Sequence, residues 1–176
     1  MNRFRSLCSI CLLTILTAHR LDGQQPMPQI SGESFAGRNI VLPDATKGHV
    51  AVLIFGFTKK SKEPTSAWAA KINSEFGGET GIELYQLPVL EDVPHFIRGM
   101  VISRIKKGVK ENMRDHFVPI LHGESELKKL VGYQEVDDAY LVILNPAGQI
   151  AEQLHGWFSD AAYEHLRTQV QAELHH

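Results

Sequence analysis

Thiols are the most nucleophilic side chains near neutral pH, and this chain of 176 residues has only two, Cys8 and Cys11. Both lie within the first dozen residues, and the sequence contains no later cysteine. Disulfide exchange needs a thiolate of lowered pKa and a second thiol that resolves the mixed disulfide. We therefore expect no thiol oxidoreductase or thiol peroxidase activity from residues 12–176.

A second set of chemically competent side chains is concentrated in residues 58–65, ahead of a predicted helix. The candidates are three lysines and their polar neighbours: Thr58, Lys59, Lys60, Ser61, Lys62 and Pro64. The amino terminus of a helix presents free N–H groups and the positive end of a dipole, which favour an anion. The loop is therefore a candidate site for a carboxylate, a phosphate or a protein partner; alternatively, it only caps the helix.

A basic surface is predicted on the longest helical pattern, residues 92–113. Its apolar side chains recur every four residues, at Ile97, Val101, Ile105, Val109 and Met113. Four cations fall together on a helical wheel, opposite this stripe: Arg104, Lys107, Lys110 and Arg114. Such a face suits an acidic partner or anionic lipid headgroups, and an ordinary solvated face is the alternative.

Histidines could act as acids, bases or metal ligands, and all but one of the nine lie beyond residue 23. They lack the tight spacing of metal sites; His116 and His122 come nearest, beside one expected strand. We therefore expect no metal and no cofactor. The aromatic pair Trp157 and Phe158 is either an exposed binding patch or packing under the last helix. The formal charge of −2 gives no indication of nucleic-acid binding.

Residues 1–23 have the pattern of a secretory signal peptide: a basic start, a short apolar run over 7–18 and a polar exit. The run is shorter than the roughly 20 apolar residues of a membrane span. We expect export to the periplasm or beyond the cell, with an uncleaved membrane anchor or a mitochondrial presequence as alternatives. Residues 24–33 are expected to be a flexible lead-in, followed by one domain over 34–176.

The order of predicted elements specifies an α/β fold. An extended pair at 35–43 precedes a strand at 49–57, a helix at 64–76, a strand at 82–90 and a helix at 92–113. These are followed by a strand at 116–121 and a helix at 125–131 capped by Ser125. The chain continues with strands at 140–144 and 149–154 and a helix at 159–174 capped by Ser159. Strands that alternate with helices indicate a parallel sheet, and the late hairpin adds antiparallel strands. We expect a central mixed sheet flanked by helices.

Three segments in this order resemble the thioredoxin-like fold of exported, TlpA-type redoxin proteins. Residues 35–43 with 48–50 are similar to the family's lead-in; residues 54–58 (IFGFT) to the strand end that presents the redox motif; residues 139–150 to its hairpin. The resemblance implies that two thiols should follow Thr58 and that a cis-proline should stand near Ala139. Neither is present here. The resemblance therefore implies a retained fold without thiol chemistry.

A narrower resemblance rests on the succession of residues 96–117, 127–133 and 140–144. It is similar to the mitochondrial ATP synthase assembly factors of the "ATP-ten" family, which are thioredoxin-like and do not depend on a cysteine pair. The resemblance implies a chaperone for a membrane-embedded subunit. We therefore expect a non-catalytic binding or assembly factor for an envelope or membrane complex, with a protein partner, possible association with a membrane surface and no nucleic acid. The alternative is a carrier or enzyme for a small anion that combines the 58–65 loop with a histidine.

Overall fold

The core of the molecule is a mixed five-stranded sheet in a computed structural model that describes residues 25–175. The strands lie in the order β1 (Gln25–Pro26), β7 (Gln149–Gly156), β6 (Ala139–Leu144), β4 (Val50–Gly56) and β5 (Ile82–Pro88). β4 runs parallel to β5 and antiparallel to β6, which in turn pairs antiparallel with β7. Two further strands, β2 (Ile30–Glu33) and β3 (Asn39–Leu42), form a separate antiparallel pair.

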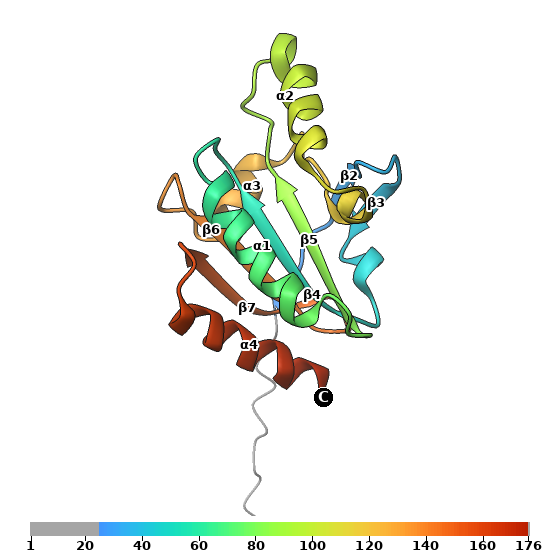
Figure 1. The fold of residues 1–176 in the computed structure, drawn as a ribbon, viewed down its shortest axis with the longest axis vertical. Helices are drawn as coiled ribbons and strands as arrows, with labels where there is room; N and C mark the ends of the chain where they lie inside the picture. The colour runs from blue at the N-terminus through green and yellow to red at the C-terminus, as the bar shows by residue number, and fades with distance from the viewer. Residues whose placement is uncertain (1–24, 176) are drawn as a thin grey trace, which may run out of the picture.

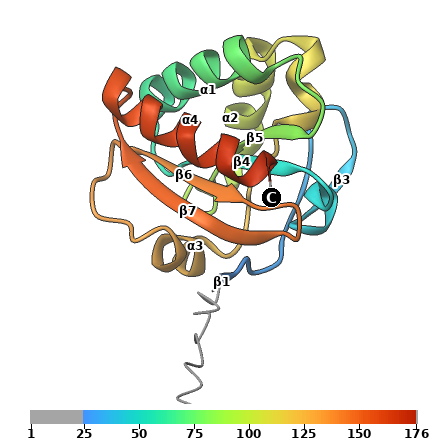
Figure 2. The same cartoon turned by 90° about the horizontal axis from the view of Figure 1, so that it is seen from below.

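The central strand β4 carries an unbroken run of apolar residues because both faces of the sheet are covered. Alternate side chains of β4 enter two apolar clusters, one on each face. Helices α1 (Lys62–Phe76) and α4 (Asp160–Leu174) cover one face, as Figure 2 shows. The short helix α3 (Glu124–Leu130) and the β2–β3 pair cover the other. The expected architecture, a mixed sheet flanked by helices, is confirmed.

Most of the predicted elements are confirmed within a few residues. The strand at 49–57 is β4, the helix at 64–76 is α1, and the hairpin at 140–154 is β6 and β7. Ser159 caps α4 as predicted, because its Oγ accepts a hydrogen bond of 3.2 Å from the Ala162 N–H. In the expected flexible lead-in, 24–33, the structure describes residues from 25 onward, and it places 25–26 in β1 and 30–33 in β2. The expected signal peptide lies outside the described residues.

The helix predicted over 92–113 is wrong in its extent. α2 spans only His95–Gly108, and a separate 3₁₀ segment, η2, covers Glu111–His116. Pro94 starts the helix late because a residue before proline avoids the helical conformation. Gly108 favours helix termination, and Val109 is extended, with φ of −93° and ψ of 126°. Figure 1 shows α2 standing out at the top of the molecule, beyond the end of β5.

Two further local predictions are corrected. The strand predicted at 116–121 is reduced to two isolated bridges, from Gln86 of β5 to Phe117 and from Val89, just after β5, to Ile120. Pro88 and Pro119 lack the N–H groups that a continuous ladder requires. Ser125 does not cap α3, since the helix already begins at Glu124 and Gly123 is its N-cap. Within residues 25–175, no helix combines the length and apolar character needed to cross a bilayer.

Candidate functional site

Residues 58–64, which we call the 58–64 loop, run from the end of β4 into the first turn of α1 and are closed by their own hydrogen bonds. Thr58 Oγ1 accepts from the N–H groups of Lys60 and Ser61, at 3.2 Å each. Ser61 Oγ accepts from the Thr58 N–H at 3.1 Å and donates to the Thr58 carbonyl at 2.8 Å. Ser61 is 1% exposed, so its hydroxyl is a buried turn-forming group with no access to a substrate.

Ser61→Ala is therefore expected to affect stability and not chemistry. The substitution leaves the partly buried N–H and carbonyl of Thr58 without their partner, and we expect a loss of about 1–2 kcal/mol in the free energy of unfolding. Chemical denaturation measures this loss. Ser66→Ala is the matched control: that serine is exposed on the same helix, so its replacement should change stability by less than about 0.5 kcal/mol.

The structure brings the 58–64 loop to the segment that precedes β6. Lys60 Nζ lies 3.3 Å from Asp137 Oδ2, two residues before Ala139. Ala139 is the first residue of β6 and is fully buried in the cluster that contains Trp68. Two sequence-based candidates, the loop and the Ala139 position, thus lie on one side of the molecule. Asp137 was not singled out from the sequence, although an acidic pair at 137–138 is complementary to a lysine-rich loop.

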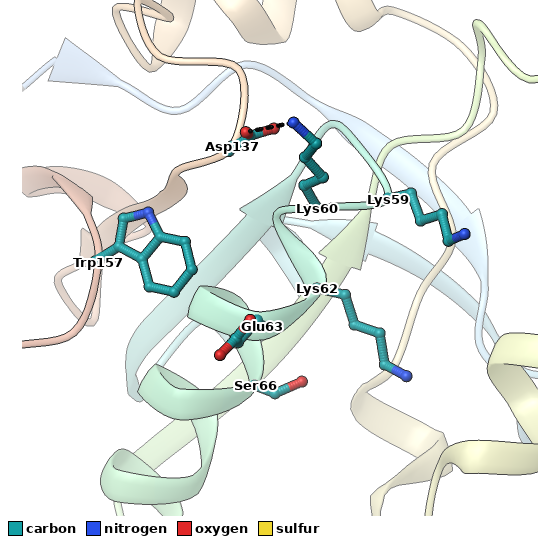
Figure 3. Close-up of a pocket in the computed structure, with 7 residues that line it drawn as sticks. All are labelled: Lys59, Lys60, Lys62, Glu63, Ser66, Asp137 and Trp157. Atoms are coloured by element: carbon teal, nitrogen blue, oxygen red, sulfur yellow. Dashed lines mark hydrogen bonds and ion pairs between the residues drawn. The ribbon is translucent and has the colours of Figure 1, made fainter.

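A groove of about 570 Å³ lies at this junction. It is lined by Lys59, Lys60, Lys62, Glu63, Ser66, Asp137 and Trp157, and we call it the Trp157 groove. Figure 3 shows Lys60 directed to Asp137, whereas Lys59 and Lys62 point away from Trp157. The lysines therefore do not converge on one point, and two carboxylates share the groove with them. Pro64, the last of the loop candidates, is buried in the first turn of α1.

Trp157 is exposed in this groove because both of its neighbours are fixed. Its side chain is 54% exposed, among the most exposed large apolar side chains of the described residues. The carbonyl of Gly156 accepts a hydrogen bond of 3.1 Å from the buried Trp68 indole. On the other side, the Phe158 ring packs edge-on against Trp68, with 5.5 Å between centroids. Trp157 is therefore exposed, as the first interpretation of the sequence proposed, whereas Phe158 is packed, as the second proposed.

A histidine and a carboxylate form a second feature beside the groove. His155 Nδ1 lies 2.9 Å from Asp138 Oδ2, and the imidazole stacks on Tyr140 with 5.6 Å between centroids. This proximity was not predicted from the sequence, although the predicted hairpin indicates it, because β6 and β7 pair Tyr140 with His155. Across residues 25–175, no group of three or more His, Cys, Asp or Glu side chains could hold a metal ion.

The predicted basic face is divided by the break between α2 and η2. Arg104 and Lys107 are exposed on α2, and Lys110 lies exposed in the extended link after it. Arg114 belongs to η2 and is half-buried, and its Nε is buried without a hydrogen-bond partner among the described residues. The prediction of one continuous four-cation face is therefore wrong. Arg104, Lys107 and Lys110 remain exposed cations far along the chain from the Trp157 groove.

Comparisons with known proteins bear on the fold. No protein-family model matches the sequence, and no curated protein matches it significantly. Among solved structures, the chain is similar to BsSco, a member of the Sco family of cytochrome c oxidase assembly proteins, at 13% identity and a TM-score of 0.62, over 85% of this chain and 94% of that one. It is also similar to a thiol-disulfide oxidoreductase from Bacteroides fragilis, at 17% identity and a TM-score of 0.57, over 82% and 98% of the two chains.

A third similar structure is an exposed lipoprotein thioredoxin from Streptococcus pneumoniae, at 14% identity and a TM-score of 0.53, over 82% and 99% of the two chains. Identities this low establish the architecture alone. The chain accordingly has a thioredoxin-like α/β fold, with a five-stranded mixed sheet flanked by helices, and resembles thiol-disulfide oxidoreductases and Sco proteins in that fold.

Proposed function

We propose that this chain is a non-catalytic thioredoxin-like protein that binds a polypeptide segment in the Trp157 groove. The observation that carries the proposal is the exposed indole of Trp157, held in place at the junction of the 58–64 loop, Asp137 and β7. Exposed tryptophan is enriched among the residues that dominate binding energy at protein interfaces. An apolar side chain of the partner would pack on this indole, and the charged groups around it would set the orientation.

The loop chemistry supports binding over catalysis. The position that the family resemblance assigns to the redox thiols contains lysines and Ser61, and no cysteine follows Cys11. Ser61 Oγ is buried and already both accepts and donates a hydrogen bond. A nucleophile must reach its substrate, and this hydroxyl does not. The loop therefore supplies shape and charge to the groove, and the Ser61 hydroxyl is not available as a nucleophile.

The alternative, a small-anion site on the 58–65 loop, has weaker support. Free N–H groups are what makes a helix amino terminus attractive to an anion. Here the N–H groups of Lys60 and Ser61, just before the helix, are already donated to Thr58 Oγ1, and Pro64 in the first turn of α1 has no N–H to offer. Glu63 and Asp137 add negative charge to the same groove. A mixed set of charges suits a polypeptide with its own alternating charges better than a phosphate or a carboxylate.

An assembly role for an envelope or membrane complex is the physiological setting we infer. It is supported by the signal-like pattern of residues 1–23 and by the fold shared with BsSco, which belongs to a family of cytochrome c oxidase assembly proteins. The narrower role implied by the sequence resemblance, assembly of ATP synthase, is one form of this proposal. In either case the chain would hold a partner polypeptide without changing its covalent structure.

Selection from a phage-displayed library of random linear peptides tests the groove directly. The full-length protein is the target, and each enriched peptide is then tested for binding to a Ser66→Trp variant. Ser66 is exposed and lines the groove, so a new indole there should fill the groove without disturbing the core. We expect enrichment of peptides that have a large apolar residue and bind with about micromolar dissociation constants.

Two results would contradict the proposal. One is a selection in which no peptide family is enriched. The other is a set of enriched peptides that bind the Ser66→Trp variant as tightly as the unmodified protein, because such peptides would occupy another surface. Thermal unfolding of the variant confirms that it is folded before it is used, and equal unfolding temperatures are expected since position 66 contributes nothing to the apolar core.

A further inference from the structure

The segment from residue 93 to residue 110 has a charge unlike the rest of the molecule. It contains no aspartate or glutamate and five cations, in a chain whose formal charge is −2. One cation, Arg98, is buried and structural: its guanidinium donates to the carbonyls of Glu91 and Val93 at 2.7–3.0 Å. The other four are exposed and form no ion pair within the described chain: Arg104, Lys106, Lys107 and Lys110.

Exposed apolar side chains lie on the same outer face of α2. Phe96 is 88% exposed and Met100 is 60% exposed. At 3.6 residues per turn, these two positions share a face with Arg104 and Lys107. Met100, Ser103, Arg104 and Lys107 also line a shallow hollow of about 240 Å³. The outer face of α2 therefore combines an apolar amino-terminal half with a basic carboxyl-terminal half.

The base of α2 is rigidly attached, so this face is held away from the sheet. Besides the contacts of Arg98, the N–H of Glu124 donates to the Glu91 carboxylate at 2.6 Å, and Glu124 in turn accepts from the N–H of Asp92. Lys128 completes the group with an ion pair to Glu124, whose hydrogen bond raises the pKa of the Lys128 ammonium. None of the apolar side chains of α2 belongs to either core cluster. Figure 1 shows the helix projecting beyond the sheet.

We propose that the outer face of α2 docks on an anionic membrane surface. Phe96 and Met100 would enter the boundary between headgroups and acyl chains, where an amphipathic helix buries its apolar side. Arg104, Lys106, Lys107 and Lys110 would stay hydrated and attract anionic headgroups. Lysine is depleted at protein–protein interfaces because its ammonium group is costly to desolvate, so three lysines among these four cations favour a lipid surface over a protein partner.

A fluorescent reporter at the helix tip tests this proposal in the full-length protein. Phe96→Trp places an indole at the most exposed apolar position, and the unmodified protein supplies the background of Trp68 and Trp157. Vesicles of about one third phosphatidylglycerol and two thirds phosphatidylcholine provide the anionic surface. We expect a blue shift of the added emission and its quenching by brominated acyl chains. Because the signal is local, membrane binding by another part of the chain cannot mimic it.

Removing cations from α2 tests the proposal quantitatively, through the affinity for anionic vesicles. Arg104→Gln with Lys107→Gln should weaken binding to the anionic vesicles by about 25-fold, since each cation near an anionic surface contributes about fivefold. Lys47→Gln with Lys129→Gln is the matched control, because it removes the same charge from exposed positions that lie off α2 and outside the Trp157 groove. Three results would overturn the proposal: no change in the added emission of the Phe96→Trp variant, an equal shift with pure phosphatidylcholine, or an equal loss of binding in both double variants. The last result would indicate attraction to overall charge.

Discussion

Trp157→Ala is expected to weaken the binding of a selected peptide by at least about 30-fold. An indole that anchors an interface typically contributes about 2 kcal/mol or more when it is truncated. The ring is already held in its exposed position in the free protein, so binding costs little conformational entropy. The Gly156 carbonyl accepts a hydrogen bond from Trp68, and the Phe158 ring packs against Trp68. Isothermal titration calorimetry on the purified variant measures the change in dissociation constant.

The control for this prediction is Phe96→Ala. It removes another exposed aromatic ring, 88% exposed against 54% for Trp157, from a helix that does not line the groove. Peptide affinity should be unchanged in this variant. A similar loss of affinity in both variants would mean that peptides bind non-specifically to exposed aromatic side chains. The Trp157 groove would then not be a specific binding site.

Tyr140→Phe is expected to destabilise the fold by about 2 kcal/mol and to loosen one wall of the groove. The buried hydroxyl accepts from the N–H groups of Gln134 and Glu135, at 3.0 and 2.8 Å, and donates to the carbonyl of Glu135 at 2.9 Å. Its removal leaves three backbone groups without this partner. The same turn precedes Asp137, so amide hydrogen exchange should increase at residues 134–138 while peptide affinity falls.

Tyr133→Phe is the matched control for that variant. Its ring stacks on Tyr140 with 5.4 Å between centroids, but its hydroxyl makes no hydrogen bond among residues 25–175. The substitution keeps the ring contacts and should change stability by less than about 0.5 kcal/mol. Equal stability of the two variants would show that the hydroxyl of Tyr140 does not hold the 134–138 segment in place.

The central elements could be predicted from sequence because their signals are local and strong. The apolar run of β4 fits a strand buried on both faces, and the turn at 145–148 places β6 beside β7. α1 is predictable because Trp68, Ile72 and Phe76 recur at helical spacing and Gly77 ends the pattern. In contrast, α2 was predicted too long. The periodicity of apolar residues continues beyond Gly108, whereas the helical conformation of the backbone ends there.

The candidate site was predictable only in part. The 58–64 loop follows from its position between β4 and α1, and the Ala139 position follows from the family resemblance. What joins them is the tertiary pairing of Phe55 with Tyr140, which places Asp137 next to Lys60. The burial of Ser61 and the outward position of Trp157 depend on hydrogen bonds between distant segments, such as Trp68 to Gly156. Such contacts cannot be predicted from the residue types alone.

The most direct test of the account is a map of backbone amide resonances as a selected peptide is added to isotope-labelled protein. If the Trp157 groove is the binding site, the largest changes will fall in residues 58–66, 135–139 and 155–158, and Trp157→Ala will abolish them. Changes confined to α2, or to the exposed face of α4, would place the peptide elsewhere and contradict the proposed function.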